Sequence, residues 1–108
     1  MAVAVFTALA DANRRAILAE LAAAGPATAT ELADRLPMTR QGITKHLTLL
    51  AHAGLVTAEP GERRRIRFRL RPEPMTVAQS YLSSLAHDWD RRLHALGSYL
   101  DQKAGKET

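Results

Sequence analysis

The sequence predicts a mainly α-helical chain with one small β-hairpin, an α+β fold that forms a single domain over residues 1–108. Three observations predict it. Hydrophobic residues make up 46% of the 108 residues and aromatic residues only 5%, a composition that favours helices over a sandwich or barrel. Apolar residues recur at helical spacing over most of the chain. Residues 55–70 instead alternate between apolar and polar types around a Pro-Gly dipeptide, which is typical of a hairpin.

The first two helices are bounded by capping and breaking residues. Apolar residues at helical spacing over residues 3–10 predict a short first helix. Asp11 is a candidate N-cap for a second helix, which ends at Gly25 and Pro26 because these residues favour a helix stop. The residues of the second helix that we expect to face the core are Ile17, Leu18 and Leu21.

Two shorter helices follow, separated by a sharp turn. Thr28 and Glu31 have the spacing of a capping box, and Pro37 ends the helix that they begin. Thr39 is the expected N-cap of the next helix, which spans about residues 39–53. Two helices joined in this way form a helix-turn-helix, in which the second is the candidate recognition helix. Its expected buried stripe is Ile43, Leu47 and Leu50.

A β-hairpin is predicted directly after the recognition helix, over about residues 55–70. We expect Leu55–Glu59 and Arg64–Leu70 to pair as strands around Pro60 and Gly61, a dipeptide suited to a type II turn. On the return strand the alternation predicts that one face packs and the other is cationic. The expected packing residues are Ile66, Phe68 and Leu70, between Arg65, Arg67 and Arg69.

A long C-terminal helix is predicted over about residues 75–103. Six apolar residues recur along it at steps of three or four, which places them on one face. A stripe this long exceeds what one helix of a small core needs, so we interpret it as half of a dimer interface. These residues, called the α-helical seam below, are Leu82, Leu85, Trp89, Leu93, Leu96 and Leu100.

Positive charge is concentrated on the recognition helix and hairpin. Over residues 39–71, Lys45 and seven arginines stand against two glutamates, a net charge of +6, whereas the whole chain carries +4. A helix that can lie in a groove, followed by a basic hairpin that can reach the flanking backbone, is typical of DNA binding.

The outward face of the recognition helix and the hairpin arginines are therefore the candidate DNA contacts. Arg and Gln suit base edges, and Arg and Lys bind phosphates. Alternatives remain open: an ordinary solvated face, a basic run that only keeps an edge strand soluble, and a structural role for His46, which borders the buried stripe. The predicted DNA-binding residues are Thr39, Arg40, Gln41, Thr44, Lys45, His46, Thr48, Arg63, Arg64, Arg65 and Arg67.

Several other classes are disfavoured by the sequence. The absence of cysteine excludes disulfides, thiolate metal sites and cysteine nucleophiles. No nucleophile–base constellation appears, so we do not expect an enzyme. No apolar run reaches the length of about 18 residues that a membrane span needs, and the N-terminus does not resemble a signal peptide. We expect a cytoplasmic protein without a membrane partner or cofactor.

Together these residues resemble the ArsR family of bacterial winged helix-turn-helix repressors over about residues 5–100. The hairpin Arg63–Leu70 is similar to the family's wing, and Trp89–Leu93 resembles the last helix of a metal-free branch. The two stretches that carry most of the resemblance are Phe6, Leu9-Ala10-Asp11, Arg14-Arg15 and Ile17-Leu18, and then Arg40-Gln41, Ile43-Thr44-Lys45-His46-Leu47 and Ala53-Gly54-Leu55-Val56.

The resemblance implies a homodimer, formed through the first and last helices, that binds an inverted repeat in double-stranded DNA. Phe6 then joins the seam at the interface. It also implies a transcriptional repressor of its own or an adjacent operon. The family's metal sensors carry a cysteine motif before the recognition helix, but residues 28–34 hold no cysteine, so we expect no metal sensing. Any small-molecule effector stays unknown.

Two alternatives remain beside this interpretation. A winged helix-turn-helix can also serve as a protein-interaction module, although a basic wing argues against it. A metal-responsive repressor could use His87 and His94, seven residues apart on the last helix with aspartates nearby. The sequence assigns neither a metal ligand nor a cofactor.

Overall fold

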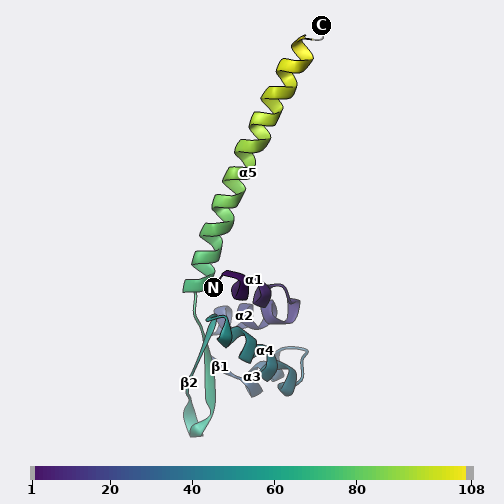
Figure 1. Cartoon of the computed structure of the whole chain (residues 1–108). Coiled ribbons are helices and arrows are strands. Elements are labelled where there is room, and N and C mark those ends of the chain that lie inside the picture. The colour runs from purple at the N-terminus through teal and green to yellow at the C-terminus, as the bar shows by residue number, and fades with distance from the viewer. Residues whose placement is uncertain (1, 107–108) are drawn as a thin grey trace. The chain divides into compact units, whose positions relative to one another are not determined.

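The computed structural model describes residues 2–106 and confirms the predicted fold class, mainly helical with one small sheet (Figure 1). The chain divides after Ala78 into two compact units, the second of which is the greater part of the last helix. The elements are α1 (Ala2–Leu9), α2 (Ala12–Ala24), β1 (Ala27–Thr28), α3 (Ala29–Arg35), α4 (Arg40–His52), β2 (Val56–Pro60), a 3-10 turn (Glu62–Arg64), β3 (Ile66–Leu70) and α5 (Glu73–Lys106).

The junction between α1 and α2 is held by polar contacts to the backbone. Asp11 caps α2 as expected, since its carboxylate accepts a hydrogen bond of 3.0 Å from the Arg14 N–H. The Arg14 side chain donates to the carbonyls of Ala8, at 2.8 Å, and Thr7, at 3.0 Å. Arg15 donates to the Leu9 carbonyl at 2.7 Å. The paired arginines therefore bind the last carbonyls of α1, which have no partner within their own helix.

The helices α3 and α4 begin as the sequence predicts. Both hydrogen bonds of the capping box are present between Thr28 and Glu31. The Thr39 hydroxyl accepts a hydrogen bond of 3.0 Å from the Gly42 N–H, so Thr39 is the N-cap of α4. Gly54, with a φ of +76°, follows α4 in a backbone conformation that favours glycine.

The core of the first unit is built where α2, α3, α4 and the start of the sheet meet. The predicted stripe of α4 is buried, with exposed fractions of 0–1%. These three side chains and their neighbours fix α4 by its inner face, which leaves its other face for solvent or a ligand. The largest fully buried side chains are Ile17, Leu32, Ile43, Leu47, Leu50 and Leu55.

The sheet has three antiparallel strands in the order β1-β3-β2, one more than the sequence predicted. The extra strand is β1, in which Ala27 pairs with Phe68 and Thr28 with Arg67. Thr28 thus ends a strand and caps α3 at once. A two-residue strand has no alternation of its own to detect, and its partner lies about forty residues further along the chain.

The hairpin connection differs from the predicted type II turn. Pro60 is the last residue of β2 and pairs with Ile66, so the connection is five residues long and contains the 3-10 turn. Arg64, expected in a strand, lies in this turn. Arg63 and Arg64 have φ values of +57° and +64°, which no sequence rule for arginine predicts.

Two further expectations are corrected by the structure. Phe68 and Leu70 pack against the core as expected, but Ile66 is 58% exposed because it lies at the outer end of β3. The last helix, α5, is longer than expected at both ends. Pro74 lies inside its first turn, where proline is tolerated because the N–H there has no helical partner. No helix among residues 2–106 is long and apolar enough to cross a membrane.

Candidate nucleic-acid interface

The outer face of α4 carries the polar side chains that the sequence singled out. Arg40, Gln41, Thr44, Lys45 and Thr48 are all exposed, whereas the stripe of Ile43, Leu47 and Leu50 is buried. The hydroxyls of Thr44 and Thr48 each donate to the carbonyl four residues earlier, at 3.0 Å. Their protons are therefore in use, and the oxygen lone pairs and methyl groups are what these threonines offer to a base edge.

Thr39 and Gly42 have structural roles at the start of this helix. The Thr39 hydroxyl serves as the N-cap. A Cβ atom at Gly42 would lie 3.1 Å from the Thr39 hydroxyl oxygen, which is a tight contact. Glycine at this position thus leaves room for the cap, a reason that the sequence did not reveal.

His46 faces the core side of α4 rather than its outer face. Its side chain is half-buried, and its Nδ1 lies 3.9 Å from a carboxylate oxygen of Asp11. Hydrogen bonding by the Arg14 N–H, together with the nearby charges of Arg14 and His46, lowers the pKa of Asp11. His46 thus places a buried ring nitrogen, which makes no hydrogen bond within residues 2–106, beside the N-cap residue of α2. This pair was not predicted from the sequence.

The wing, defined here as residues 56–70, carries two kinds of arginine. Arg63, Arg64 and Arg65 are exposed, and within residues 2–106 their side chains take part in no ion pair. Arg67 and Arg69 instead bind Glu59 on the neighbouring strand, at 3.1 and 3.0 Å. The hydrogen bond from Arg69 lowers the pKa of Glu59, and the charge of Arg67 adds to the effect. This ion-pair cluster was also missed from the sequence.

A groove joins the recognition helix to the wing tip. Arg40 and Thr44 of α4 line it on one side, and Arg64 and Arg65 line it on the other. Its volume is about 630 Å³. Arg40 and the pair Arg64 and Arg65, more than twenty residues apart in sequence, thus border one concave surface, which suits a polyanion. The remaining lining residues are Thr28, Ala29, Thr30, Ile66 and Phe68.

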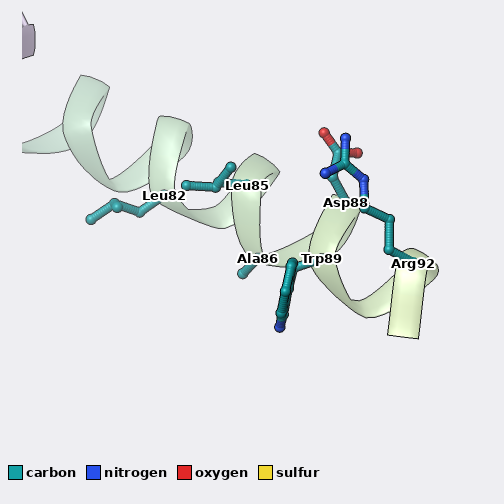
Figure 2. Close-up of a pocket in the computed structure, with 6 residues that line it drawn as sticks. All are labelled: Leu82, Leu85, Ala86, Asp88, Trp89 and Arg92. Carbon is teal, nitrogen blue, oxygen red and sulfur yellow. The ribbon is translucent and has the colours of Figure 1, made fainter. Parts of the chain in front are cut away.

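The α-helical seam of the second unit is exposed. Its six side chains are 48–59% exposed in the single chain. Figure 2 shows Leu82, Ala86 and Trp89 on the same side of the helix ribbon, along a shallow depression of about 450 Å³ that Leu85, Asp88 and Arg92 also line. Phe6 of α1, the remaining predicted interface residue, is half-buried and packs against the core.

The described residues contain no group of three or more histidine, aspartate or glutamate side chains that could hold a metal ion. His87 and His94 both lie on α5. Each stands two residues before a seam residue, Trp89 or Leu96, and residues two apart on a helix do not share a face. The geometry of α5 thus directs both histidines away from the seam.

Comparisons with known proteins agree with this geometry. The family model described as "Helix-turn-helix domain" matches residues 9–59. The HTH-type transcriptional regulator Rv2034 of Mycobacterium tuberculosis is 35% identical over 96 residues, which cover 89% of this chain and 85% of that protein. The match to the helix-turn-helix model includes α2, α3 and α4.

Solved structures give the same result over nearly the whole chain. The ArsR-like transcriptional regulator from Rhodococcus sp. RHA1 has a TM-score of 0.84 and 38% identity, with 93% of this chain and 90% of that chain covered. The AntR antimony-specific transcriptional repressor has a TM-score of 0.59 and 25% identity, with 82% and 79% covered. This chain belongs to the ArsR-like family of winged helix-turn-helix transcriptional regulators.

Proposed function

We propose that this protein is a homodimeric repressor that binds an inverted-repeat operator in double-stranded DNA. The observation that carries the proposal is the groove between α4 and the wing tip, because it gathers Arg40, Arg64 and Arg65 on one concave surface. A DNA strand passing through this groove would meet base-reading side chains on one side and phosphate-binding side chains on the other. Membership of a family of transcriptional regulators supports DNA as the polyanion.

The two sides of the groove would contact different parts of the DNA. Arg40, Gln41, Thr44 and Thr48 stand on the exposed face of α4, where they can reach base edges in a major groove. Lys45 and the three wing-tip arginines, Arg63–Arg65, would bind phosphates of the flanking backbone. Thr39 and His46, which the sequence also offered, are engaged as the N-cap and beside Asp11, so we assign them to holding α4 in place.

A second copy of the chain is the proposed occupant of the seam. Six large apolar side chains on one face of α5 are about half exposed, and a contiguous exposed apolar stripe of this kind marks an interaction surface. A two-fold dimer covers it with an identical stripe, to which we add Phe6 from the resemblance. Such a dimer presents two recognition helices, and this arrangement predicts an inverted-repeat operator.

The proposed repressor does not sense metals. The AntR structure belongs to a repressor described as antimony-specific, but this chain lacks cysteine, and its α5 histidines point away from the seam. Its occupancy on DNA would then depend on its own concentration, as in an autorepressor, or on an organic ligand. A metal site that uses His87 or His94 is the competing possibility, and the metal titration described in the Discussion tests it.

The proposed function can be tested by selecting the sequences that the protein binds from a random DNA pool. The protein is then footprinted on the enriched sequences. We expect an inverted repeat with half-sites about one helical turn apart, or a multiple of that distance. Failure to enrich any sequence, with no retention of duplex DNA at low salt, would overturn the proposal and favour a protein-interaction module.

Single substitutions extend this test to the groove. Arg40→Ala is expected to reduce discrimination between selected and random DNA by about 1–3 kcal/mol. Arg65→Ala should weaken binding to both DNAs and flatten the salt dependence by about 0.9 in slope. Arg35→Ala is the matched control, because that guanidinium already lies 3.7 and 3.6 Å from the carboxylates of Glu20 and Glu31.

A further inference from the structure

The wing carries five arginines in its last eight residues, but the structure divides them into two sets. Arg67 lies directly opposite Glu59 in the strand register, and its NH2 group donates to Glu59 at 3.1 Å. Arg69, one pair further along the same face, donates from Nε and NH2 to both carboxylate oxygens, at 3.0 and 3.2 Å. A bidentate guanidinium–carboxylate contact of this kind is stronger than a single ion pair.

The stem of Arg67 is also held along the hairpin. Its Nε is buried, and its Cγ lies where a Cβ atom on Gly61 would approach to 2.9 Å. The absence of a side chain at Gly61 therefore makes room for Arg67 to lie across the end of the hairpin. An arginine packed in this way cannot extend toward a phosphate without leaving both Gly61 and Glu59.

We propose that Glu59 is a positioning residue that holds Arg67 and Arg69 against the hairpin, and so confines the wing's DNA contacts to Arg63, Arg64 and Arg65. This inference rests on the proposed DNA-binding function. Phosphate contacts by arginine raise affinity for all DNA sequences alike. By engaging two of the five cations, Glu59 lowers binding to random DNA and leaves the contribution of α4 to sequence discrimination intact.

The experiment compares Glu59→Gln with Glu62→Gln, which removes the same charge from the wing tip at a residue whose carboxylate takes part in no ion pair within residues 2–106. Binding to a short duplex of random sequence is measured by fluorescence anisotropy over a range of salt concentrations. We expect E59Q to bind more tightly than E62Q. Its salt slope should be steeper by about 0.9 for each freed arginine that reaches a phosphate, or about 1.8 for both.

Two further variants keep the test decisive. Adding Arg69→Ala to E59Q should remove about 0.9 of the gained slope. In the otherwise unchanged protein, Arg69→Ala should leave the slope as it is, whereas Arg65→Ala should flatten it. The comparison of Arg69→Ala with Arg65→Ala does not use E59Q. It therefore tests the inference even if E59Q alters the fold of the wing, a change that circular dichroism would reveal.

The outcomes separate this inference from the proposed function. If the unchanged protein binds DNA but E59Q and E62Q behave alike, or Arg69→Ala and Arg65→Ala flatten the slope equally, the role assigned to Glu59 is wrong and the repressor proposal stands. If the unchanged protein binds no duplex, both are wrong.

Discussion

At the scale of single residues, the wing tip holds two arginines in a backbone conformation that arginine rarely adopts. Arg63 and Arg64 adopt φ values of +57° and +64°, in the left-handed region that glycine and asparagine occupy far more readily. Each non-glycine residue held there costs about 1 kcal/mol or more. Stability alone does not explain two arginines at these positions, whereas the phosphate contacts proposed above would.

A glycine substitution at Arg63 separates stability from binding. We expect Arg63→Gly to leave the free energy of unfolding unchanged or to raise it slightly, because relief of the strained backbone offsets the added freedom of the unfolded chain. Affinity for DNA should fall and the salt slope should flatten by about 0.9. Urea unfolding and anisotropy titration measure the two effects.

The matched control is Arg65→Gly, since Arg65 has an ordinary extended backbone with a φ of −80°. Glycine there brings no relief of strain and should lower stability by about 0.5–1 kcal/mol, together with a similar loss of DNA affinity. Equal destabilisation by the two glycine substitutions would show that the left-handed tip is not strained.

At the scale of elements, the start of α4 couples a cap to a glycine. Glycine inside a helix is normally about 1 kcal/mol less favourable than alanine. Here a Cβ atom would meet the Thr39 hydroxyl oxygen at 3.1 Å, and this oxygen accepts the Gly42 N–H. We therefore expect Gly42→Ala alone to bring much less than the usual gain in stability.

A double-mutant cycle tests this coupling. Thr39→Ala should cost about 1 kcal/mol through loss of the cap, and Gly42→Ala added to Thr39→Ala should then recover about 1 kcal/mol. Urea unfolding of the four proteins gives the coupling free energy. Strictly additive effects would mean that the Cβ atom is accommodated beside the cap without cost.

The helices were predictable from sequence because their signals are local. The Asp11 cap, the Thr28–Glu31 capping box and the stripe of α4 each lie within one or two turns, and each is present in the structure. The wing turn was not predictable, because its arginines adopt a conformation against their own preference. Strand β1 escaped detection because its two residues are ordered by pairing with β3, far along the chain.

The candidate site also has one part that could be predicted from the sequence and one part that could not. The exposed residues of α4 follow from helical periodicity, since burial of Ile43, Leu47 and Leu50 fixes the opposite face. The engagement of Arg67 and Arg69 by Glu59 depends on the register between β2 and β3. The expected two-residue turn would have set another register, so this ion-pair cluster could not be deduced from the sequence.

At the scale of the whole molecule, the seam of α5 predicts that dimerisation and DNA binding fail together. Trp89 and Leu93 are about half exposed in the single chain and would be buried between two copies. Truncating a buried side chain of this size costs about 2–5 kcal/mol. We expect Trp89→Ala and Leu93→Ala to shift the protein toward monomer in sedimentation experiments and to weaken binding to the selected inverted repeat.

Arg91→Ala serves as the control, because Arg91 lies two residues from both Trp89 and Leu93 and so faces away from the seam. It should stay dimeric. A monomeric unchanged protein at micromolar concentration, or equal dissociation of the Arg91 variant, would contradict a dimer formed through this face.

The response to metals is the remaining property of the proposed dimer that the structure lets us predict. Thiolate ligands are impossible without cysteine. His87 and His94 stand on the side of α5 opposite the seam, so dimerisation through the seam does not bring them toward the partner copy. We expect the affinity for the operator to stay within a few-fold of its metal-free value when the protein is titrated with zinc, nickel, cobalt or arsenite, each with a chelator control at fixed salt.

A tenfold fall in affinity corresponds to a coupling free energy of about 1.4 kcal/mol between metal and DNA binding. Such a fall, abolished by His87→Ala or His94→Ala, would instead identify a metal-responsive repressor whose ligands lie on the outer face of α5.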